Sequence, residues 1–579
     1  MKSKTVTVMQ RKTILSIRKP ILPFSFLLLA ISILFTTHAI AIPFSNWSTV
    51  ANGATKLPGD PSQSFFSFNQ PSINDAGLVV FRGRAKATSP KGNQGGMTSG
   101  IFSRDMSQSG TAVTTITTRG QAIPAPNNIE IPGPAQFNEF PSIPRIDAAS
   151  DTIAFRGQSQ PSWNIVLGEG EETRSGTAGI YVLPDNGPLT TGSRNIEPTQ
   201  CFPQYLVPGE NNIRFEQYPG SPSPTGSKIV YKGNWTDATG KGKTGVFYRD
   251  LQAENGQAAA VKIAQRGDDI PVAALPTGMT SAQFGSTAPP SAAEDKMVFT
   301  GLDNEDAPTA GGIFLADLVE NSALKTMAGF RTEVPGNSGT TLSSFGEALS
   351  FDGRYVGFWA GWGSETIQKT FECGSDGNRS LLNDCRSQDD NGTPNDGIYS
   401  FDVIVHQGIF LADTVEEELY LVAQTGDVFE DFLFWHFSGK PSDAGEGDEG
   451  ESARWRNSSY LAVDGDDIVF KAQETDGTIG LYGALDVTSL DYDIFTLLSV
   501  GMDGGLLDAM ATGLPISELS LERDGFRNGQ LAISASMDDG ENSRAGIYIA
   551  TVPEPSSWAL FILGAAALTF WRWHKKEKI

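Results

Sequence analysis

The chain has 579 residues, a formal net charge of −24, 39% hydrophobic residues and only three cysteines. This length is ample for a large core and, taken alone, suggests roughly two to four domains. So acidic a surface repels nucleic acid and anionic membranes, which argues against nucleic-acid-binding proteins. It favours divalent cations or basic partners, although a simple solvated surface explains most single acidic runs.

The N-terminus has the pattern of a secretory signal peptide. Residues 1–20 contain six basic residues and no acid, and an apolar stretch runs from Ile21 to Phe35. Ala39-Ile40-Ala41 then fits a small-residue cleavage site. We therefore expect residues 1–41 to be a signal peptide, the alternative being an uncleaved N-terminal anchor. In both cases the chain from Ile42 onward is exported.

Three short phrases recur in the same order along residues 42–551, which indicates a repeat. The first is an apolar strand that ends in an aromatic residue and often a glycine, and the second is Gly-Ile-Phe or a close variant. The third is an apolar strand ending in Gly or Gly-Asp. The first phrase lies around Phe81, Phe155, Tyr231, Phe299, Phe358, Phe470 and Ile533, and the second around Phe102, Tyr181, Phe247, Phe314, Phe410, Tyr482 and Tyr548. The third lies at 114–120, 261–268, 324–329, 419–427 and 495–501, with 200–209 as its best candidate in the second unit.

These phrases predict an all-β fold and, most specifically, a seven-bladed β-propeller over residues 42–551. They are β-branched and aromatic and are bounded by Gly, Pro, Asn and Asp, which is typical of strands and turns, and we expect no helix among them. The seventh unit lacks the third phrase, and a matching stretch stands at 48–60. An N-terminal strand would thus complete the last blade and close the ring. The alternative is a pair of β-sandwiches. In the propeller, the aromatic residues of the first phrase belong to the core between blades.

Two acidic insertions interrupt the repeat near 362–407 and 428–458. The first contains Cys373 and Cys385, a close pair for which we expect a disulfide in an oxidising compartment, with Cys201 left as a single thiol. It also groups carboxylates between glycines, as calcium sites do, but without the spacing of an EF-hand. The candidate calcium ligands are Asp376, Asp384, Asp389, Asp390 and Asp396, and a solvated, disulfide-linked loop without a cofactor is the alternative. Trp359, Trp362, Trp435 and Trp455 lie in or beside the insertions and suit either sugar stacking or core packing.

The sequence offers little catalytic machinery. Between residues 42 and 551 the histidines are His406 and His436, which leaves little for a Ser-His-Asp or Cys-His arrangement. Neither a G-x-S-x-G elbow nor an H-E-x-x-H motif is present. A pair of carboxylates for glycoside hydrolysis remains open, since many Asp and Glu residues are available.

The C-terminal residues 552–579 combine three elements that favour a sorting and anchoring role. Val552, Pro553, Glu554 and Pro555 precede an apolar run from Trp558 to Trp571, and a basic end follows. Physically this is a short membrane-spanning helix whose basic end stays cytoplasmic. The combination closely resembles the PEP-CTERM sorting signal of bacteria that make extracellular polysaccharide, and the repeat resembles the uncharacterised propeller-like domains of exported proteins with that signal. The resemblance implies cleavage near the motif by an exosortase-type enzyme; a plain C-terminal anchor is the alternative.

Together these patterns lead us to expect an exported, non-enzymatic propeller at the cell envelope or surface. It would act as a scaffold or binding protein, anchored at least transiently by its C-terminal helix. Its partners would be the sorting machinery and extracellular polysaccharide or envelope proteins. The alternative is an extracellular glycoside hydrolase or polysaccharide lyase of propeller fold, which carboxylates converging at the mouth of the central channel would favour.

Overall fold

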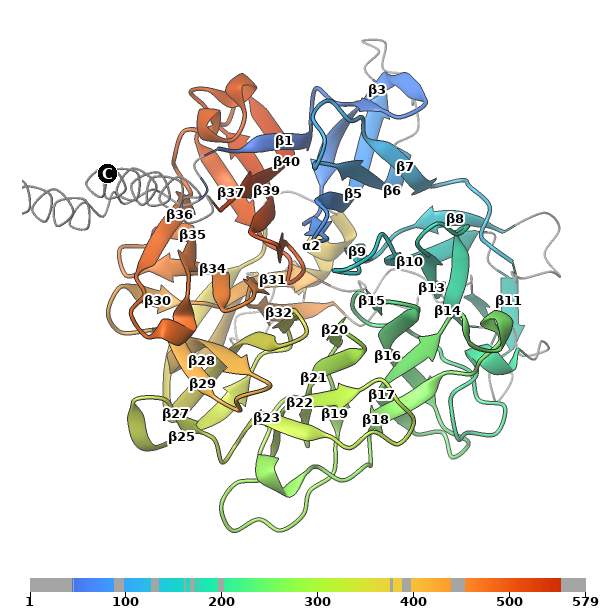
Figure 1. Cartoon of the computed structure of the whole chain (residues 1–579), viewed down its shortest axis with the longest axis vertical. Helices are drawn as coiled ribbons and strands as arrows, with labels where there is room; N and C mark the ends of the chain where they lie inside the picture. The colour runs from blue at the N-terminus through green and yellow to red at the C-terminus, as the bar shows by residue number, and fades with distance from the viewer. Residues whose placement is uncertain are drawn as a thin grey trace, which may run out of the picture. The chain divides into compact units, whose positions relative to one another are not determined.

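Seven antiparallel sheets follow one another around a common axis in the computed structural model (Figure 1). The structure describes residues 44, 46–87, 98–125, 135–160, 163–166, 172–175, 178–195, 202–374, 379–387, 397–438 and 453–552. Each sheet is one blade with four strand positions, which we name A to D from the axis outward. In six blades position A is split into an outer and an inner strand that both pair with strand B, whereas in blade 3 the outer part is a single bridge between Gln217 and Asn234. The expected all-β fold and seven-bladed arrangement are confirmed.

Blades 1 to 4 are built from the first part of the chain. Blade 1 contains β2 (Lys56–Leu57), β3 (Asp60–Phe68), β4 (Ser72–Ile73), β5 (Leu78–Ala87), β6 (Thr98–Asp105) and β7 (Thr114–Thr118). Blade 2 contains β8 (Gln136–Glu139), β9 (Arg145–Ile146), β10 (Ile153–Gln160), β13 (Ala178–Leu183) and β14 (Thr190–Arg194), beside a separate hairpin of β11 (Trp163–Val166) and β12 (Glu172–Ser175). Blade 3 contains β15 (Ser223–Thr225), β16 (Lys228–Thr236), β17 (Gly242–Asp250) and β18 (Val261–Gln265). Blade 4 contains β19 (Ser286–Thr287), β20 (Ser291–Ala293), β21 (Lys296–Leu302), β22 (Gly311–Asp317) and β23 (Lys325–Gly329).

Blades 5 to 7 complete the ring. Blade 5 contains β24 (Glu333–Val334), β25 (Asn337–Phe345), β26 (Ser350–Phe351), β27 (Tyr355–Glu372), β28 (Ile398–Asp413) and β29 (Leu419–Gln424). Blade 6 contains β30 (Phe429–Asp431), β33 (Leu461–Asp464), β34 (Asp467–Glu474), β35 (Ile479–Ala484) and β36 (Ile494–Ser499), beside a hairpin of β31 (Phe434–Ser438) and β32 (Arg454–Ser458). Blade 7 contains β37 (Ile516–Ser520), β38 (Phe526–Arg527), β39 (Gln530–Asp538), β40 (Ser543–Thr551) and β1 (Ser48–Asn52). Short 3-10 turns lie at Pro203–Tyr205, Ala253–Gly256, Val272–Ala274, Val487–Ser489, Gly504–Leu506 and Ala509–Ala511.

The seven inner pieces of position A form a closed cycle around the axis. Each touches the next, and the last, β38, touches the first, β4. The first two sequence phrases correspond to strands B and C in every blade, as predicted. The proposed copy of the third phrase at 200–209 is wrong: strand D of blade 2 is β14, and Pro203–Tyr205 is a 3-10 turn. Strand β14 reads Thr-Thr-Gly-Ser-Arg, so it carries no apolar signature.

The N-terminal strand closes the ring, as the sequence predicted. β1 takes position D of blade 7 and pairs antiparallel with β40, with Ser48 opposite Ile549 and Asn52 opposite Gly546. In Figure 1 this blue strand lies beside the red C-terminal blade. The edge of β40 is therefore covered, and β1 becomes the outer strand of blade 7, as strand D is in the other blades.

The hydrophobic core of the described residues is divided into seven clusters, one at each interface between neighbouring blades. Alternate residues of strand B serve the two neighbours: Phe81 packs toward blade 7 and Val80 toward blade 2. The glycine of the first phrase has a steric reason, because a Cβ on Gly83 would lie 2.8 Å from the ring of Phe65. The aromatic residues predicted to be core are fully or almost fully buried, namely Phe81, Phe155, Tyr231, Phe299 and Phe470.

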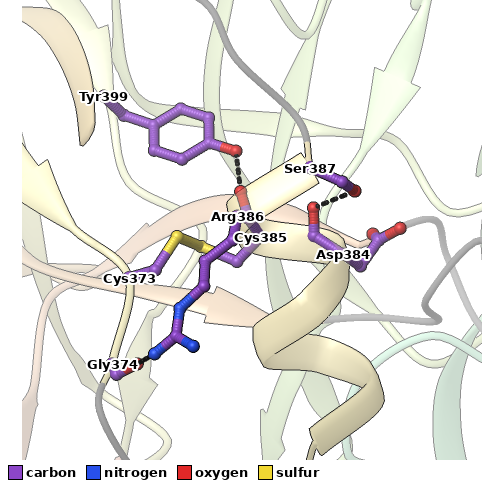
Figure 2. Close-up of a disulfide and its surroundings, with 7 residues drawn as sticks. All are labelled: Cys373, Gly374, Asp384, Cys385, Arg386, Ser387 and Tyr399. Carbon is purple, nitrogen blue, oxygen red and sulfur yellow. Dashed lines mark hydrogen bonds between the residues drawn. A yellow bond between two sulfur atoms is a disulfide. The ribbon is translucent and has the colours of Figure 1, made fainter. Parts of the chain in front are cut away.

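Strands β27 and β28 run beyond blade 5 and form an arm with the β31–β32 hairpin of blade 6. An aromatic cluster joins the two hairpins, with Phe371 and Trp435 ring centroids 4.9 Å apart. At the tip, α2 (Arg379–Ser387) is linked to β27 by a disulfide between Cys373 and Cys385 (Figure 2). The expectation of no helix is therefore wrong here, since α2 forms within the insertion between the two long strands of blade 5. No α-helix in the described part of the chain is long and apolar enough to cross a membrane.

Candidate functional site: the mouth of the central channel

The turns between strands A and B of all seven blades meet at one end of the axis, where they surround a pocket of about 330 Å³. We call this pocket the axial mouth. Two-residue turns in the left-handed region place their polar side chains at the rim, as at Glu294 and Asp295 with φ of 50° and 57°. The charged residues of its wall are Asp75, Asp147, Glu294, Asp295, Asp352, Asp464 and Arg527. Six carboxylates therefore face one guanidinium.

Burial and crowding hold several of these carboxyls closer to neutrality than usual. Burial raises the pKa of Asp75, Arg527 lowers it, and the nearby charges of other mouth carboxylates raise it again. Burial likewise raises the pKa of Asp147 and of Asp352, against hydrogen bonds that favour the charged forms. Raised pKa values at converging carboxylates are a known property of acid–base sites, although structural ion networks share it.

A belt of hydrogen bonds joins the seven turns around the mouth and engages three of the six carboxylates, those of Asp147, Asp352 and Asp464. Asp352 is an example: Oδ1 accepts from the backbone N–H of Arg354 and Tyr355 at 2.8 and 2.6 Å, and Oδ2 accepts from Gly465 N–H of the next blade at 2.7 Å. The complete belt consists of Asp75 N–H to Ala148 O, Gly226 N–H to the Asp147 carboxylate, Asp295 N–H to Thr225 Oγ1, Lys296 Nζ to Gly353 O, Gly465 N–H to Asp352, Gly529 N–H to Asp464, and Asn528 Nδ2 to Asp75 O.

The segment Glu522–Asp524, which precedes β38, crosses the axis below the mouth; we call it the plug. Arg145 of blade 2 is 0% exposed and donates from Nη2 to Glu522 Oε1 at 2.7 Å, and its Nε lies 3.5 Å from Asp524. Burial lowers the pKa of Arg523 to about 10. The plug also binds blades 1, 4 and 5, through Ile73 N–H to Asp524 O, Arg523 Nη1 to Pro289 O, and Ser350 Oγ to Arg523 O. The mouth is thus a blind cup above a closed centre.

This arrangement can bind or polarise a small polar group, but few of its side chains are free to take part in a reaction. Asp147, Asp352 and Asp464 already accept hydrogen bonds that hold the blades together, so their removal would loosen the rim. Asp75 and Glu294 are exposed at the rim, and neither carboxylate is engaged by another described residue, so these two are the mouth groups most available to a ligand. In the described part of the chain, no group of three or more His, Cys, Asp or Glu side chains is placed to hold a metal ion.

Most residues singled out in the sequence lie away from this mouth or outside the described residues. Cys373 and Cys385 are joined, with Cα atoms 6.0 Å apart, and Tyr399 Oη donates to Cys385 O (Figure 2). Asp384 lies on α2 and is buried, while the other candidate calcium ligands, Asp376, Asp389, Asp390 and Asp396, and the motif residues Pro553, Glu554 and Pro555 fall outside the described residues. Val552 is described, and its N–H donates to Gly529 O at 2.7 Å.

The four tryptophans of the insertions have different surroundings. Trp359 and Trp362 are 4% and 5% exposed and belong to the core between blades, so packing is their role in the structure. Trp435 and Trp455 are half-buried in the aromatic cluster of the arm.

Sequence reasoning missed the mouth carboxylates and the plug. The mouth residues lie at the end of the short inner piece of strand A or within two positions after it. An alignment of the units on strand B would have placed Asp75, Asp352 and Asp464 together, since each precedes the aromatic residue of its strand B by six positions. The plug has no counterpart in the other units that would have marked it. Its charge alternation, Glu-Arg-Asp, was the available signal.

Comparison with known proteins adds little to this site. No protein-family model matches the chain, and no curated protein matches it. Among solved structures, a puromycin-hydrolysing peptidase of Mycobacterium tuberculosis is similar with 11% identity and a TM-score of 0.31, over 89% of this chain and 63% of that one. A family 117 glycoside hydrolase of Zobellia galactanivorans has 14% identity and a TM-score of 0.23, over 62% and 89%. An exo-inulinase of Aspergillus awamori has 11% identity and a TM-score of 0.24, over 84% and 93%. Likeness at this level carries no inference about activity.

Proposed function

We propose that this protein is an exported, non-enzymatic propeller that binds an extracellular partner at the cell envelope. The observation that supports this most is that carboxylates of the axial mouth already accept hydrogen bonds that join the blades. A propeller enzyme of the glycosidase type needs two free carboxyl groups across an open cleft. Here three of the six mouth carboxylates are engaged in the belt, and a fourth, Asp295, pairs with Lys228. The remaining two, Asp75 and Glu294, face a mouth that the plug closes from below, and not an open cleft.

The rest of the ring supports a scaffold that presents loops. Seven interfaces and a closed inner cycle make a rigid frame, and binding residues commonly lie on loops that such a frame positions. The arm is the largest addition to the repeat, and its disulfide suits an oxidising location. Extracellular polysaccharide or an envelope protein is the partner class we propose, with delivery and processing through the C-terminal sorting signal.

The convergence of carboxylates at the mouth favours one alternative, an extracellular glycoside hydrolase or polysaccharide lyase. Asp75 would then act from the rim, where the surrounding protein partly shields its carboxyl from water. This desolvation and the neighbouring carboxylates raise the pKa of Asp75, as a general acid requires. The raised pKa of Asp147 fits a partner in the same pocket.

One screen separates the two. The full-length protein, in a detergent without a sugar headgroup, is incubated with a panel of bacterial exopolysaccharides and read for both retention and release of reducing or unsaturated ends. We expect retention of at least one polysaccharide without cleavage. Cleavage that Asp75→Asn abolishes, and that the exposed control Asp491→Asn preserves, would establish the enzyme instead. Neither retention nor cleavage would leave the glycan-binding proposal without support.

A further inference from the structure

A second pocket lies at the seam where the ring closes, between blade 7 and blade 1. Its volume is about 190 Å³. Strands β37, β39 and β40 form one wall, and the end of β3 with the residues after it forms the other. The side chains that matter are three serines, two carboxamides and one aromatic ring: Ser520, Ser534, Ser536, Asn69, Gln70 and Phe68. We call it the seam pocket.

The seam pocket exists because one position of the repeat is small in blade 7. In blade 1, strand B continues from Phe81 to Arg82, and Arg82 Nη1 reaches the next blade to donate to Phe140 O at 2.6 Å. The register places Ser534 at the same position, since Arg82 pairs with Ile101 and Ser534 with Ile547. Each follows the corresponding pair of its blade, Phe81 with Phe102 and Ile533 with Tyr548. A serine cannot span the gap, so the space that a guanidinium fills between blades 1 and 2 stays open at the seam.

The same position is occupied by a longer side chain in most other blades. It is Arg156, Lys232, Trp359 and Lys471 in blades 2, 3, 5 and 6, and Thr300 in blade 4. Thr300 Oγ1 donates to Gly346 O of the next blade at 2.7 Å, so even the shorter residue bridges its gap. Within the described residues, the Ser534 hydroxyl bridges nothing. Among the seven blades, serine at this position is therefore particular to blade 7, at the seam.

The free hydrogen-bonding groups of the wall define the ligand class. None of the three serine hydroxyls or the two carboxamides makes a hydrogen bond to another described side chain or backbone group. Phe68 is half-buried, so part of its ring borders the cavity. Glu518, the one carboxylate of the wall, also interacts with the Lys471 ammonium of blade 6, where burial lowers the pKa of Lys471 and the Glu518 charge opposes that shift.

We propose that the seam pocket binds one neutral sugar ring of a glycan. Hydroxyls and carboxamides match vicinal hydroxyl groups as both donors and acceptors, and an aromatic ring packs against the apolar face of a sugar. The volume is below the roughly 300 Å³ at which pockets hold drug-sized ligands, so a single ring is the expected occupant. This proposal rests on the proposed function of glycan binding, and it assigns that binding to the seam pocket.

The test fills the pocket with the side chain that the protein itself uses elsewhere. Ser534→Arg should place a guanidinium at Phe68 O, as Arg82 does at Phe140 O, and should therefore fold. Saturation-transfer NMR and calorimetry with glucose, galactose and mannose on the full-length protein should give a Kd on the order of 1 mM for at least one sugar. Ser534→Arg should weaken it at least about tenfold, while Ser517→Arg, which adds the same charge at an exposed site outside the pocket, should leave it unchanged.

Three outcomes would overturn the proposal, and they also locate the failure. Sugar binding that survives Ser534→Arg in a protein with wild-type melting behaviour would place the site elsewhere and leave the glycan-binding function intact. Preference for glucuronate or glucosamine over the neutral sugars would contradict the ligand class. No binding of any sugar, with polysaccharide retention also absent, would remove both proposals. If Ser534→Arg fails to fold, Gln70→Ala with Ser536→Ala gives the same readout by removing hydrogen bonds without adding volume.

Discussion

At the scale of single residues, Arg145 holds the centre of the ring together. It is completely buried, and both of its anionic partners, Glu522 and Asp524, are also buried. Its Nη1 lies 3.5 Å from Pro290 O of blade 4, so one side chain connects three blades. A buried ion pair of this kind adds little net stability by itself, but removal of one partner leaves uncompensated charge.

We therefore expect Arg145→Met to lower the free energy of unfolding by about 3 kcal/mol, because two buried carboxylates would lose the cation that they share. The loss stays at the lower end of the range for broken buried ion pairs, since Arg523 still lies 3.4 Å from Glu522 and Arg527 still lies 2.9 Å from Asp524. Chemical denaturation of the purified protein measures the change. Lys325→Met is the matched control, because Lys325 also forms a 2.7 Å ion pair, with Glu417, but on the exposed surface. An equal loss in both variants would show that the plug does not depend on Arg145.

Asp467, the first residue of β34, predicts a dependence on pH. Burial raises its pKa to about 6, and three neighbouring aspartates add to the rise. Because the unfolded chain has the ordinary pKa near 4, the folded state holds the proton more tightly. The resulting stability is complete below about pH 4 and is lost as the pH rises through about 6.

Asp467→Asn should remove this dependence. The amide stays neutral at every pH, and its oxygen can still accept from Asp486 N–H, which lies 2.8 Å from Asp467 Oδ1. Melting temperatures of both proteins, taken from about pH 4 to pH 8, should diverge in favour of the variant as the pH rises. A constant difference across that range would mean that Asp467 ionises normally in the folded protein.

At the scale of elements, β1 is the strand on which blade 7 depends. Val50 is 0% exposed and packs with Ile547 and Ile549 in the cluster between blades 7 and 1. Arg104 of blade 1 also donates to the carbonyls of Thr49 and Val50, at 3.0 and 2.7 Å. The strand therefore joins two blades as well as completing one.

Val50→Asp should detach this strand, because an unpaired carboxylate would be buried in an apolar cluster. We expect a loss of about 3 kcal/mol or more in the free energy of unfolding. Hydrogen exchange should show the β40 amides that donate to β1 losing protection first. Ser48→Asp adds the same charge at an exposed position of β1 and should change neither quantity by much. Preserved protection of β40 in Val50→Asp would show that the blade stands without its fourth strand.

The strands differed in how well the sequence predicted them, and the reason is chemical. Strands B and C carry aromatic residues next to glycines that make room for them, so their copies are recognisable. The inner pieces of strand A are two to four residues long and are rich in serine that bridges blades, as Ser72 Oγ does by donating to Pro144 O at 2.9 Å. Such a segment reads as a loop. β14 was missed for a similar reason, since its five residues are polar apart from glycine.

At the scale of the whole molecule, the two candidate sites arise from differences among blades. The architecture followed from counting phrases, because seven copies and a displaced strand allow few other arrangements. The axial mouth could not be predicted in that way, since it brings together one turn from each of seven blades. The seam pocket was still harder to predict. In the sequence, Ser534 belongs to a weak copy of the first phrase and simply stands where blade 1 has Arg82. The consequence of the serine is visible only in the structure, where its short side chain leaves the space between β39 and blade 1 unfilled.

The pairing of β1 with β40 also determines when the ring can close as the chain is made and folds. A ribosome makes β1 first and β40 last, so the pair of Ser48 and Ile549 forms only when the entire ring has been made. Closing so long a loop adds little free-energy cost beyond that of a shorter one, but contacts this distant in sequence form slowly. Until then the apolar face that blade 1 turns toward blade 7, including Phe65 and Phe81, has no cover. The arrangement that protects the finished ring therefore leaves the unfinished chain with an apolar surface on blade 1 that is prone to aggregation until the final strand arrives.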